Sequence, residues 1–386
     1  MVEKPSKIMK QIQGKSEKKK NPFFTNPVRK GVYFVGRKRE LNRFLRSIRD
    51  SLSYDTPENL FITGEKGVGK TSFMYYLDNF NLDLGFFTIE EFPSTARKFY
   101  GAKIRAMIEQ EITKYGETKK PYKEHSSEIN KIYERSVSKI DSGVAYPFTE
   151  IKRDFKKIKT LIEDNGDIKN FVFFFDECNK FPNISESYAS QLNNVLYSNN
   201  IYVFTTLPLV PNKLRKKHPT TRDRIADKID LKPFSEEESR KAVNKRLKPR
   251  EEEPFTEEAL DKLIQASEGN PRELMLNSRE AYEIYSLEDL EEIDVEVIEK
   301  VLEERKQTDV QILYNGLSEA KKKVLKQVKE LEEPTTSKIA EELDRTSGTI
   351  SVHLNALKEK GLLEKERKRE KVLYNLSFDN DIDLGE

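Results

Sequence analysis

Four short runs rich in hydrophobic residues mark the N-terminal half of the chain, with helix-like segments before and between them. The runs are residues 60–63, 85–92, 171–175 and 200–208. Runs without polar alternation are typical of strands that are buried on both faces of a parallel sheet. One helix-like segment, Leu41–Ile48, precedes the first run and places its apolar residues on a single helical face. The pattern predicts an α/β fold, a doubly wound parallel sheet that binds ligands at the carboxyl ends of its strands.

The pattern changes after residue 232. Residues 233–306 read as all-helical, and Gly269-Asn270-Pro271 is the main helix breaker. Three shorter helices and two short strands then follow, which is the element order of a winged helix. The helices are expected at Ser318–Glu330, Thr336–Leu343 and Ser347–Lys358, with Thr336 and Ser347 as N-caps, and the strands near 362–366 and 371–376.

These shifts predict five segments. They are a basic tail (1–20), an α/β core (21–232), a helical lid (233–306), a winged helix (307–378) and an acidic tail (379–386). Within the core, the charged region 94–164 is longer than a strand crossover requires. We expect two or three helices there, on the sheet or projecting from it.

Composition narrows the function classes. Of the 386 residues, 36% are hydrophobic and 35% charged, with a net charge of +2, so any nucleic-acid surface must be a local patch. The single cysteine, Cys178, excludes an intrachain disulfide and suits a reducing compartment. No apolar run approaches the roughly 20 residues that span a bilayer. We therefore expect a cytoplasmic protein without a membrane partner.

The strongest chemical signal is G-x-x-x-x-G-K-T at Gly64–Thr71, between an apolar run and a helix. Glycines such as Gly64, Gly67 and Gly69 let backbone N–H groups turn toward an anion at the helix N-terminus. Lys70 is then expected to reach the β- and γ-phosphates of ATP, and Thr71 to bind Mg²⁺. The alternative is a glycine-rich turn that binds nothing.

Two acidic residues follow the third hydrophobic run. Asp176 is expected to hold Mg²⁺, and Glu177 to orient and deprotonate the water that attacks the γ-phosphate. The alternative is a pair of surface acids after a strand. Thr205 and Thr206 end the next strand, and Thr206 is the candidate for sensing the γ-phosphate, although strand-end threonines are also common β residues.

Three arginines are candidates for contacting the nucleotide, two of them as stabilisers of the transition state. Arg222 and Arg224 lie on a short turn, from which a guanidinium can reach the γ-phosphate of a neighbouring subunit. Such a role would require self-association of the protein. A structural ion pair is the alternative. Arg272 follows the breaker in the helical lid and is expected to fold back on the nucleotide.

The C-terminal unit carries a candidate interface for double-stranded DNA. One helix presents short polar groups to a major groove, and a basic hairpin is expected to contact the phosphate backbone. The alternative is a winged helix that contacts protein. The residues are Thr349, Ser351, His353, Asn355 and Lys358 on the helix, and Arg367, Lys368 and Arg369 in the hairpin.

The order of these motifs resembles an AAA+ ATPase. "FVGRKREL", "GEKGVGKT", "FFFDE", "TTLP", "RDRI" and "EGNPREL" match the box before the first helix, Walker A, Walker B, sensor 1, the arginine-finger region and sensor 2. With the C-terminal winged helix, residues 21–378 resemble the archaeal origin-recognition/Cdc-type replication initiators. The resemblance implies ATP-controlled DNA binding, with nucleotide between core and lid and with Val35, Gly36 and Arg37 bordering the adenine. Region 94–164 departs from the initiators' pattern.

We therefore expect an ATP-hydrolysing protein that binds double-stranded DNA, as a replication initiator or a DNA-loading factor. Two alternatives remain open. One is a STAND-like regulatory or defence switch, in which nucleotide binding assembles a complex. The other is an AAA+ regulator of a transposase.

Overall fold

The computed structural model describes most of the chain. The described residues are 21–29, 31–54, 58–77, 84–115, 119–144, 146–164, 168, 170–196, 200–225, 227–368 and 371–378. The predicted tails and Arg369 lie outside them. The described residues form two compact units. One holds those up to Glu253 together with Leu263–Arg279, and the other holds Pro254–Lys262 and those from Glu280 on.

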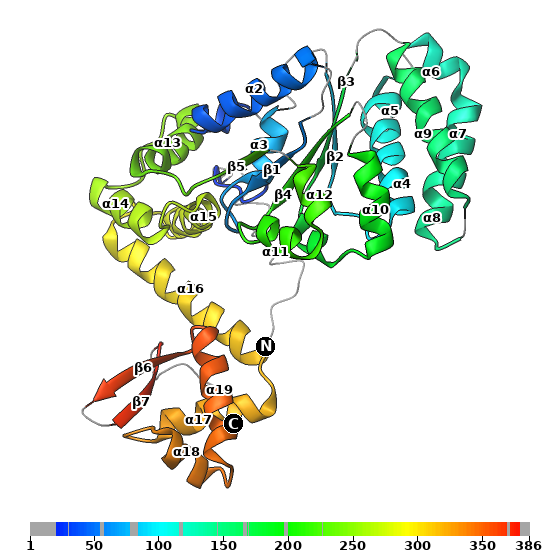
Figure 1. The fold of residues 1–386 in the computed structure, drawn as a ribbon. Coiled ribbons are helices and arrows are strands. Elements are labelled where there is room, and N and C mark those ends of the chain that lie inside the picture. Colours follow the sequence, from blue (N-terminus) through cyan, green and yellow to red (C-terminus); the bar gives the residue numbers. More distant parts are fainter. Residues whose placement is uncertain are drawn as a thin grey trace, which may run out of the picture. The chain divides into compact units, whose positions relative to one another are not determined.

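A five-stranded parallel sheet forms the centre of the first unit (Figure 1). Its order is β2-β3-β4-β1-β5, so consecutive strands are not always neighbours and the connections cross over. The predicted doubly wound α/β fold is thus confirmed. The strands are β1 (Leu60–Thr63), β2 (Leu84–Ile89), β3 (Asn170–Phe175), β4 (Ile201–Thr206) and β5 (Asp227–Asp230).

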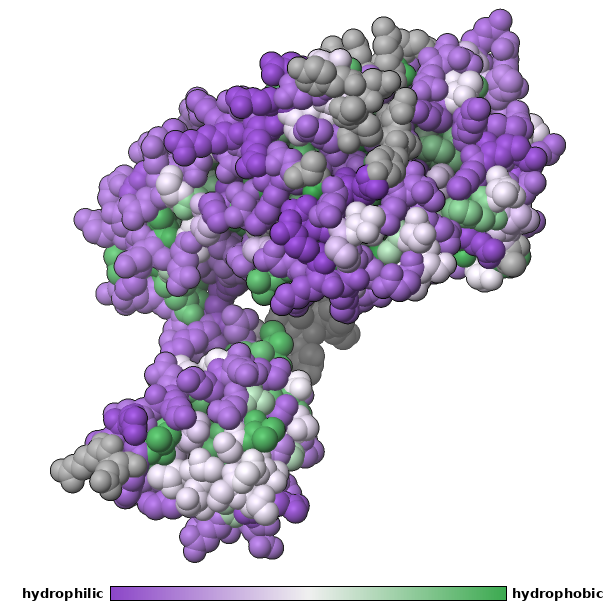
Figure 2. Space-filling view, viewed as in Figure 1, coloured by the Kyte–Doolittle hydropathy of each residue, from purple (hydrophilic) through white to green (hydrophobic). Residues whose placement is uncertain are grey.

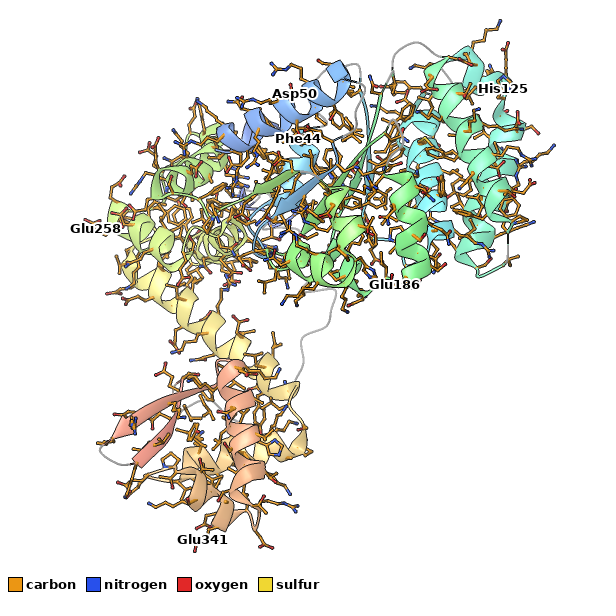
Figure 3. All side chains as sticks on the ribbon, viewed as in Figure 1. Phe44, Asp50, His125, Glu186, Glu258 and Glu341 are labelled. Atoms are coloured by element: carbon orange, nitrogen blue, oxygen red, sulfur yellow. The ribbon has the colours of Figure 1, made fainter. Side chains whose placement is uncertain are left out.

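Each face of the sheet has its own hydrophobic core, because successive strand side chains point to opposite faces. Phe173 and Phe175 of β3 belong to one core, and Val172 and Phe174 belong to the other. On the second face Phe44 of α2 lies 6.0 Å from Phe174, measured between ring centroids (Figure 3). The helices of this α/β part are α2 (Lys38–Tyr54), α3 (Lys70–Leu77), α10 (Glu186–Val195), α11 (Val210–Lys217) and α12 (Pro219–Asp223), with 3₁₀ turns η1 (Gly31–Tyr33) and η4 (Cys178–Asn183).

The sequence pattern did not predict β5. This edge strand is only four residues long, and of its side chains only Ile229 is buried. A strand with one buried residue has no hydrophobic run to mark it, so only its pairing with β1 makes it a strand.

Region 94–164 forms three helical rods, whose helices are labelled α4 to α9 in Figure 1. The first rod packs on β2 and on the third rod. A Cβ at Gly101 of the first rod would lie 2.9 Å from the Ser136 carbonyl oxygen of the second, so a glycine is needed for this close approach. The rods are α4-η2-α5 (Ala96–Met107, Ile108–Ile112, Thr113–Tyr115), α6-α7-η3-α8 (Lys120–Glu124, Ser126–Tyr133, Glu134–Ser138, Lys139–Asp141) and α9 (Phe148–Glu163), where η2 and η3 are π-helical turns.

Helices replace strands after β5, as expected. They are α13 (Glu236–Leu247), η5 (Lys248–Arg250), α14 (Glu257–Ala266), α15 (Pro271–Leu287) and α16 (Val295–Asn315). The winged helix follows, with α17 (Glu319–Glu330), α18 (Thr336–Glu342), α19 (Ser347–Glu359), β6 (Leu363–Lys368) and β7 (Lys371–Leu376). The N-cap predictions were wrong by one residue. Thr335 and Thr346 are the caps, because their hydroxyls accept the N–H groups of Lys338 and Thr349.

The surface visible in Figure 2 is mainly hydrophilic, with hydrophobic residues in small separated areas. Among the described residues, seven large hydrophobic side chains are exposed. They are Val32, Leu52, Val144, Leu209, Leu287, Ile312 and Val352. Within the same residues, no helix has the length and apolar character that crossing a membrane requires.

Candidate nucleotide and nucleic-acid sites

The glycine-rich loop joins β1 to α3, so its backbone lies at the carboxyl end of the sheet and at a helix N-terminus. Gly67 and Gly69 adopt φ angles of 84° and 97°, which side chains rarely tolerate. The Lys70 ammonium donates to the carbonyl oxygens of Gly64 (2.8 Å) and Glu65 (2.9 Å). The loop thus has the strand–loop–helix context that the sequence predicted, and its binding of phosphates stays a prediction.

The Lys70 ammonium is half-buried and has three carboxylates near it. Burial lowers the pKa of Lys70, and the carboxylates of Asp176, Glu65 and Glu177 oppose that shift. A phosphate beside the ammonium would favour its charged form in the same way.

The ends of β3 and β4 and the start of α3 bring a hydroxyl–carboxylate cluster to the loop. The Thr71 hydroxyl donates to Asp176 Oδ2 at 2.6 Å, and the Thr205 hydroxyl donates to Asp176 Oδ1. Asp176 is 7% exposed, and the described part of the chain gives it no cationic hydrogen-bond partner. Hydroxyl and carboxylate oxygens are the ligands that Mg²⁺ prefers.

The neighbouring threonine behaves differently. The Thr206 hydroxyl donates to the Leu207 carbonyl oxygen at 3.0 Å, so Thr205 is the residue of this pair that contacts Asp176. Alternation along β4 turns the two side chains to opposite faces of the sheet. The γ-phosphate role of Thr206 stays a prediction, and sequence alone does not say which threonine faces the loop.

Glu177 is exposed beside this cluster. Its φ angle is 47°, in the left-handed region, and its backbone N–H donates to Asp176 Oδ1 at 2.9 Å and to Thr205 Oγ1 at 3.2 Å. These bonds hold the turn after β3 and present the Glu177 side chain to solvent near the loop. Cys178, next in the chain, is fully buried, and burial raises its thiol pKa well above the ordinary value, as a packed side chain requires.

The Gly269–Arg272 segment packs directly on the glycine-rich loop. Asn270 Nδ2 donates to the Lys66 carbonyl oxygen at 3.0 Å, and a Cβ at Gly67 would lie 2.5 Å from Asn270 Oδ1. Arg272 is exposed, and its backbone N–H donates to Asn270 Oδ1 at 3.0 Å. The sequence pattern singled out Arg272 as a site residue but not Asn270, which lies in the same motif.

Arg37 is a buried support for the loop. Its guanidinium donates to the carbonyl oxygens of Val68 (2.9 Å) and Lys232 (2.6 Å), and it lies over the Phe234 ring. Burial lowers the pKa of Arg37, and Glu40 and Glu238 oppose the shift. Val35 is also buried, so the adenine contacts of both residues stay predictions.

The two candidate arginine fingers differ in their surroundings. Arg222 donates to the Ile225 carbonyl oxygen at 2.6 Å and lies over the Phe61 ring, and burial is the main cause that lowers its pKa. The backbone carbonyl of Arg224 accepts from Asn59, and its side chain is half-buried. Arg222 thus already has an internal role, and the action of either arginine on a neighbouring subunit stays a prediction.

In the winged helix, α19 packs on the hydrophobic core through three buried residues, Ile350, Leu354 and Leu357. The predicted contacts Thr349, Asn355 and Lys358 are exposed, whereas Ser351 and His353 are half-buried at the edges of the free face. In the hairpin, Arg367 and Lys368 are exposed near its tip, and the Lys371 ammonium donates to Glu333 at 3.0 Å.

Comparison with known proteins agrees with this arrangement. Residues 318–365 match the family described as bacterial regulatory protein, arsR family. An uncharacterized HTH-type transcriptional regulator of Methanocaldococcus jannaschii is 29% identical over 400 residues, covering 100% of this chain and 97% of that protein.

Among solved structures, the Aeropyrum pernix ORC1 protein in complex with DNA aligns with a TM-score of 0.56 and 16% identity, over 92% of this chain and 91% of that one. The Aeropyrum pernix ORC2 protein aligns with a TM-score of 0.54 and 13% identity, over 91% and 94% of the two chains. The chain therefore has the fold of the archaeal ORC-type AAA+ proteins, and its residues 318–365 are similar to the arsR-type family.

Proposed function

We propose that this protein binds and hydrolyses Mg²⁺-ATP and binds double-stranded DNA through its winged helix, as an initiator-like or DNA-loading factor. The observation that carries the proposal is the convergence of Lys70, Thr71 and Asp176 at the carboxyl ends of β1 and β3, in a chain that also holds a winged helix. The hydroxyl and carboxylate oxygens suit Mg²⁺, and the glycine-rich backbone suits phosphates.

In the proposed mechanism, Lys70 neutralises the β- and γ-phosphates, while Thr71 and Asp176 orient Mg²⁺. Glu177 takes a proton from the attacking water, because its carboxylate is exposed beside the cluster. Arg272 borders the loop through the Asn270 contact and supplies positive charge from the lid side. An arginine of a second copy, Arg222 or Arg224, completes the site.

Two substitutions test the ATPase assignment. Lys70→Ala removes the phosphate contact and is expected to abolish binding of a fluorescent ATP analogue. Glu177→Gln is expected to keep ATP bound and to stop phosphate release, because the cradle is intact and the base is lost. Hydrolysis at the wild-type rate by Glu177→Gln would contradict the role of Glu177.

DNA binding is tested at the wing. Replacing Arg367, Lys368 and Arg369 by Ala is expected to weaken binding to every duplex by a similar factor. The plot of log K against log salt should flatten by about 0.9 for each phosphate that the variant no longer neutralises. Unchanged affinity and slope would remove the wing from the interface and favour a regulatory switch without DNA contact.

A second candidate is an ATP-controlled transcription regulator. The arsR-type match, together with the description of the Methanocaldococcus relative, favours it. Mapping the bound DNA in cells distinguishes the two roles, since an initiator is expected at replication origins and a regulator at promoters.

A further inference from the structure

The recognition helix α19 carries one exposed aliphatic side chain in the middle of its free face. Val352 is 67% exposed. Gly348 and Asn355 lie four and three residues from Val352, Glu359 lies two turns further along the same face, and all are exposed. The opposite side of the helix holds the three buried residues that face the core. Val352 is thus the centre of the surface that α19 turns outward.

A valine at such a position has a cost, because its methyl groups stay in water and its branched side chain is a poor helix former. Among the described residues of 318–378, it is the only large hydrophobic side chain that is exposed. The matched region ends at residue 365, so Val352 lies inside the arsR-type helix-turn-helix. Single exposed aliphatic side chains are common on protein surfaces. The position of Val352 in the middle of the free face of α19 is what points to a bound partner.

The major groove of DNA offers a matching group. Each base pair presents hydrogen-bonding atoms there, but thymine also presents a C5-methyl group, which apolar side chains contact. Asn355, one turn further along the same face, is the residue type that pairs with adenine. Gly348 adds no side chain at the N-terminal end of that face, so the helix backbone can approach the bases closely.

We propose that Val352 is a specificity residue that recognises thymine through its C5-methyl group. The inference rests on the proposed binding of double-stranded DNA and deepens it by naming the base. It places the reading surface at Gly348, Val352 and Asn355, while Ser351 and His353 at the edges have less access to base pairs. The charged wing residues supply affinity that does not depend on sequence.

The test uses the full chain with Mg²⁺-ATP. A preferred duplex is selected from a pool with a randomised centre, and each thymine in it is then replaced singly by deoxyuridine, which lacks only the methyl group. Fluorescence anisotropy measures each affinity. For the wild type, we expect the loss of one particular methyl to weaken binding about fourfold, as for one buried methyl group. Val352→Ala is expected to bind the thymine and deoxyuridine duplexes equally.

Ile312→Ala is the matched control, because Ile312 is an aliphatic side chain that is 63% exposed on α16 rather than on α19. It should retain the fourfold difference. Val352→Thr keeps the side-chain shape and exchanges one methyl for a hydroxyl, so this variant is expected to fold even if Val352→Ala does not. Its affinities for the thymine and deoxyuridine duplexes should differ by less than fourfold.

The outcomes separate the two hypotheses. If the wild type binds duplex DNA but no deoxyuridine replacement weakens it, or if Val352→Ala keeps the methyl preference, Val352 does not read thymine and the proposed DNA binding stands. Such a result would favour a protein partner for this face. If the wild type selects no duplex at all, DNA binding and the thymine inference both fail.

Discussion

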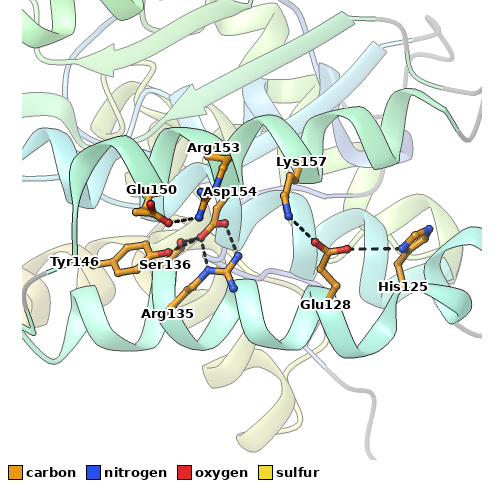
Figure 4. A network of polar contacts seen from close by, with 9 residues as sticks. All are labelled: His125, Glu128, Arg135, Ser136, Tyr146, Glu150, Arg153, Asp154 and Lys157. Atoms are coloured by element: carbon orange, nitrogen blue, oxygen red, sulfur yellow. Dashed lines mark hydrogen bonds and ion pairs between the residues drawn. The ribbon is translucent and has the colours of Figure 1, made fainter.

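Asp154 and Asp176 are both buried carboxylates. Asp154 lies in region 94–164, called the helical insertion below, and Asp176 lies beside the glycine-rich loop. The groups that donate hydrogen bonds to them differ in charge. Asp154 accepts from Arg135 Nε (2.7 Å) and Nη2 (2.5 Å), from the Ser136 hydroxyl (2.5 Å) and from the Tyr146 hydroxyl (3.2 Å), as Figure 4 shows. The guanidinium neutralises its charge, and all partners belong to the insertion.

Asp176 accepts only from two threonine hydroxyls and a backbone N–H among the described residues. Its hydrogen bonds orient it without supplying a formal charge. The Lys70 ammonium interacts with it electrostatically but is hydrogen-bonded to loop carbonyl oxygens, so a divalent cation could still bind the carboxylate. Burial alone therefore does not identify a functional carboxylate. What separates the structural carboxylate from the candidate metal ligand is whether a cationic side chain is hydrogen-bonded to it.

The largest expected effect comes from Asp154→Ala. It leaves the Arg135 guanidinium and two hydroxyls without their acceptor, and we expect unfolding free energy to fall by about 3–5 kcal/mol. Urea unfolding measures it. Glu128→Ala, which removes an exposed pair with Lys157, is the control and should cost less than about 1 kcal/mol. A similar loss of unfolding free energy in the two variants would show that the buried cluster does not contribute most of the stability of the insertion.

The same cluster predicts a pH dependence. Burial opposes ionisation of Asp154, but the hydrogen bonds from Arg135 and Ser136 outweigh it and hold the pKa of Asp154 below its ordinary value. Its stabilisation is therefore present above the unfolded pKa and is lost as pH falls through the folded pKa. The difference between wild type and Asp154→Ala should shrink below about pH 4.

Asp176→Asn tests whether Asp176 is a metal ligand. The amide keeps the size of the side chain and removes the charge, so we expect little change in stability. The gain in affinity for a fluorescent ATP analogue on adding Mg²⁺ should fall by about tenfold or more. Titrations with Mg²⁺ and with EDTA measure this. A Mg²⁺ effect as large as in the wild type would exclude Asp176 as a ligand.

Lys103 on α4 is a buried cation, and it extends the comparison from carboxylates to a group of opposite charge. Its ammonium lies among aromatic rings, 4.0 Å from the Phe155 centroid, and donates to the Tyr202 hydroxyl at 3.1 Å. Burial, together with repulsion from Lys159, lowers its pKa well below the ordinary value. Within the described part of the chain no carboxylate pairs with it, so we expect Lys103→Met to raise the melting temperature.

The effect of Lys103 should also depend on pH. The unfolded chain binds a proton at Lys103 more readily than the folded one, so wild-type stability rises with pH up to the unfolded pKa, near 10. The advantage of Lys103→Met should be greatest near neutral pH and decline toward that value. A lower melting temperature at every pH would mean that its hydrogen bond and ring contacts outweigh the cost of burial.

The smallest effect is expected from Asn270→Ala, which removes the hydrogen bond to the Lys66 carbonyl oxygen and the one accepted from the Arg272 N–H. We expect nucleotide affinity to fall several-fold, or about 1 kcal/mol. Asn193→Ala, on α10 away from the loop, is a matched control for the loss of an amide. An equal fall in nucleotide affinity in the two variants would show that Asn270 does not support the nucleotide site.

Sequence alone determined the parts of this protein that depend on local pattern. The glycine-rich loop needs glycines at fixed spacing, strands such as β3 and β4 contain runs of four or five hydrophobic residues, and α17–α19 bury stripes with helical period. Each of these requirements is met within a few residues, so the pattern is readable without the fold.

Tertiary structure decided which side chains meet. Strand register turned Thr205 toward Asp176, loop packing brought Asn270 to Lys66, and helix rotation placed Val352 at the centre of a free face. These outcomes depend on segments far apart in sequence or on a one-residue choice of face. Hydrophobic period predicts that an element forms, but hydrogen-bond partners are set only when elements pack.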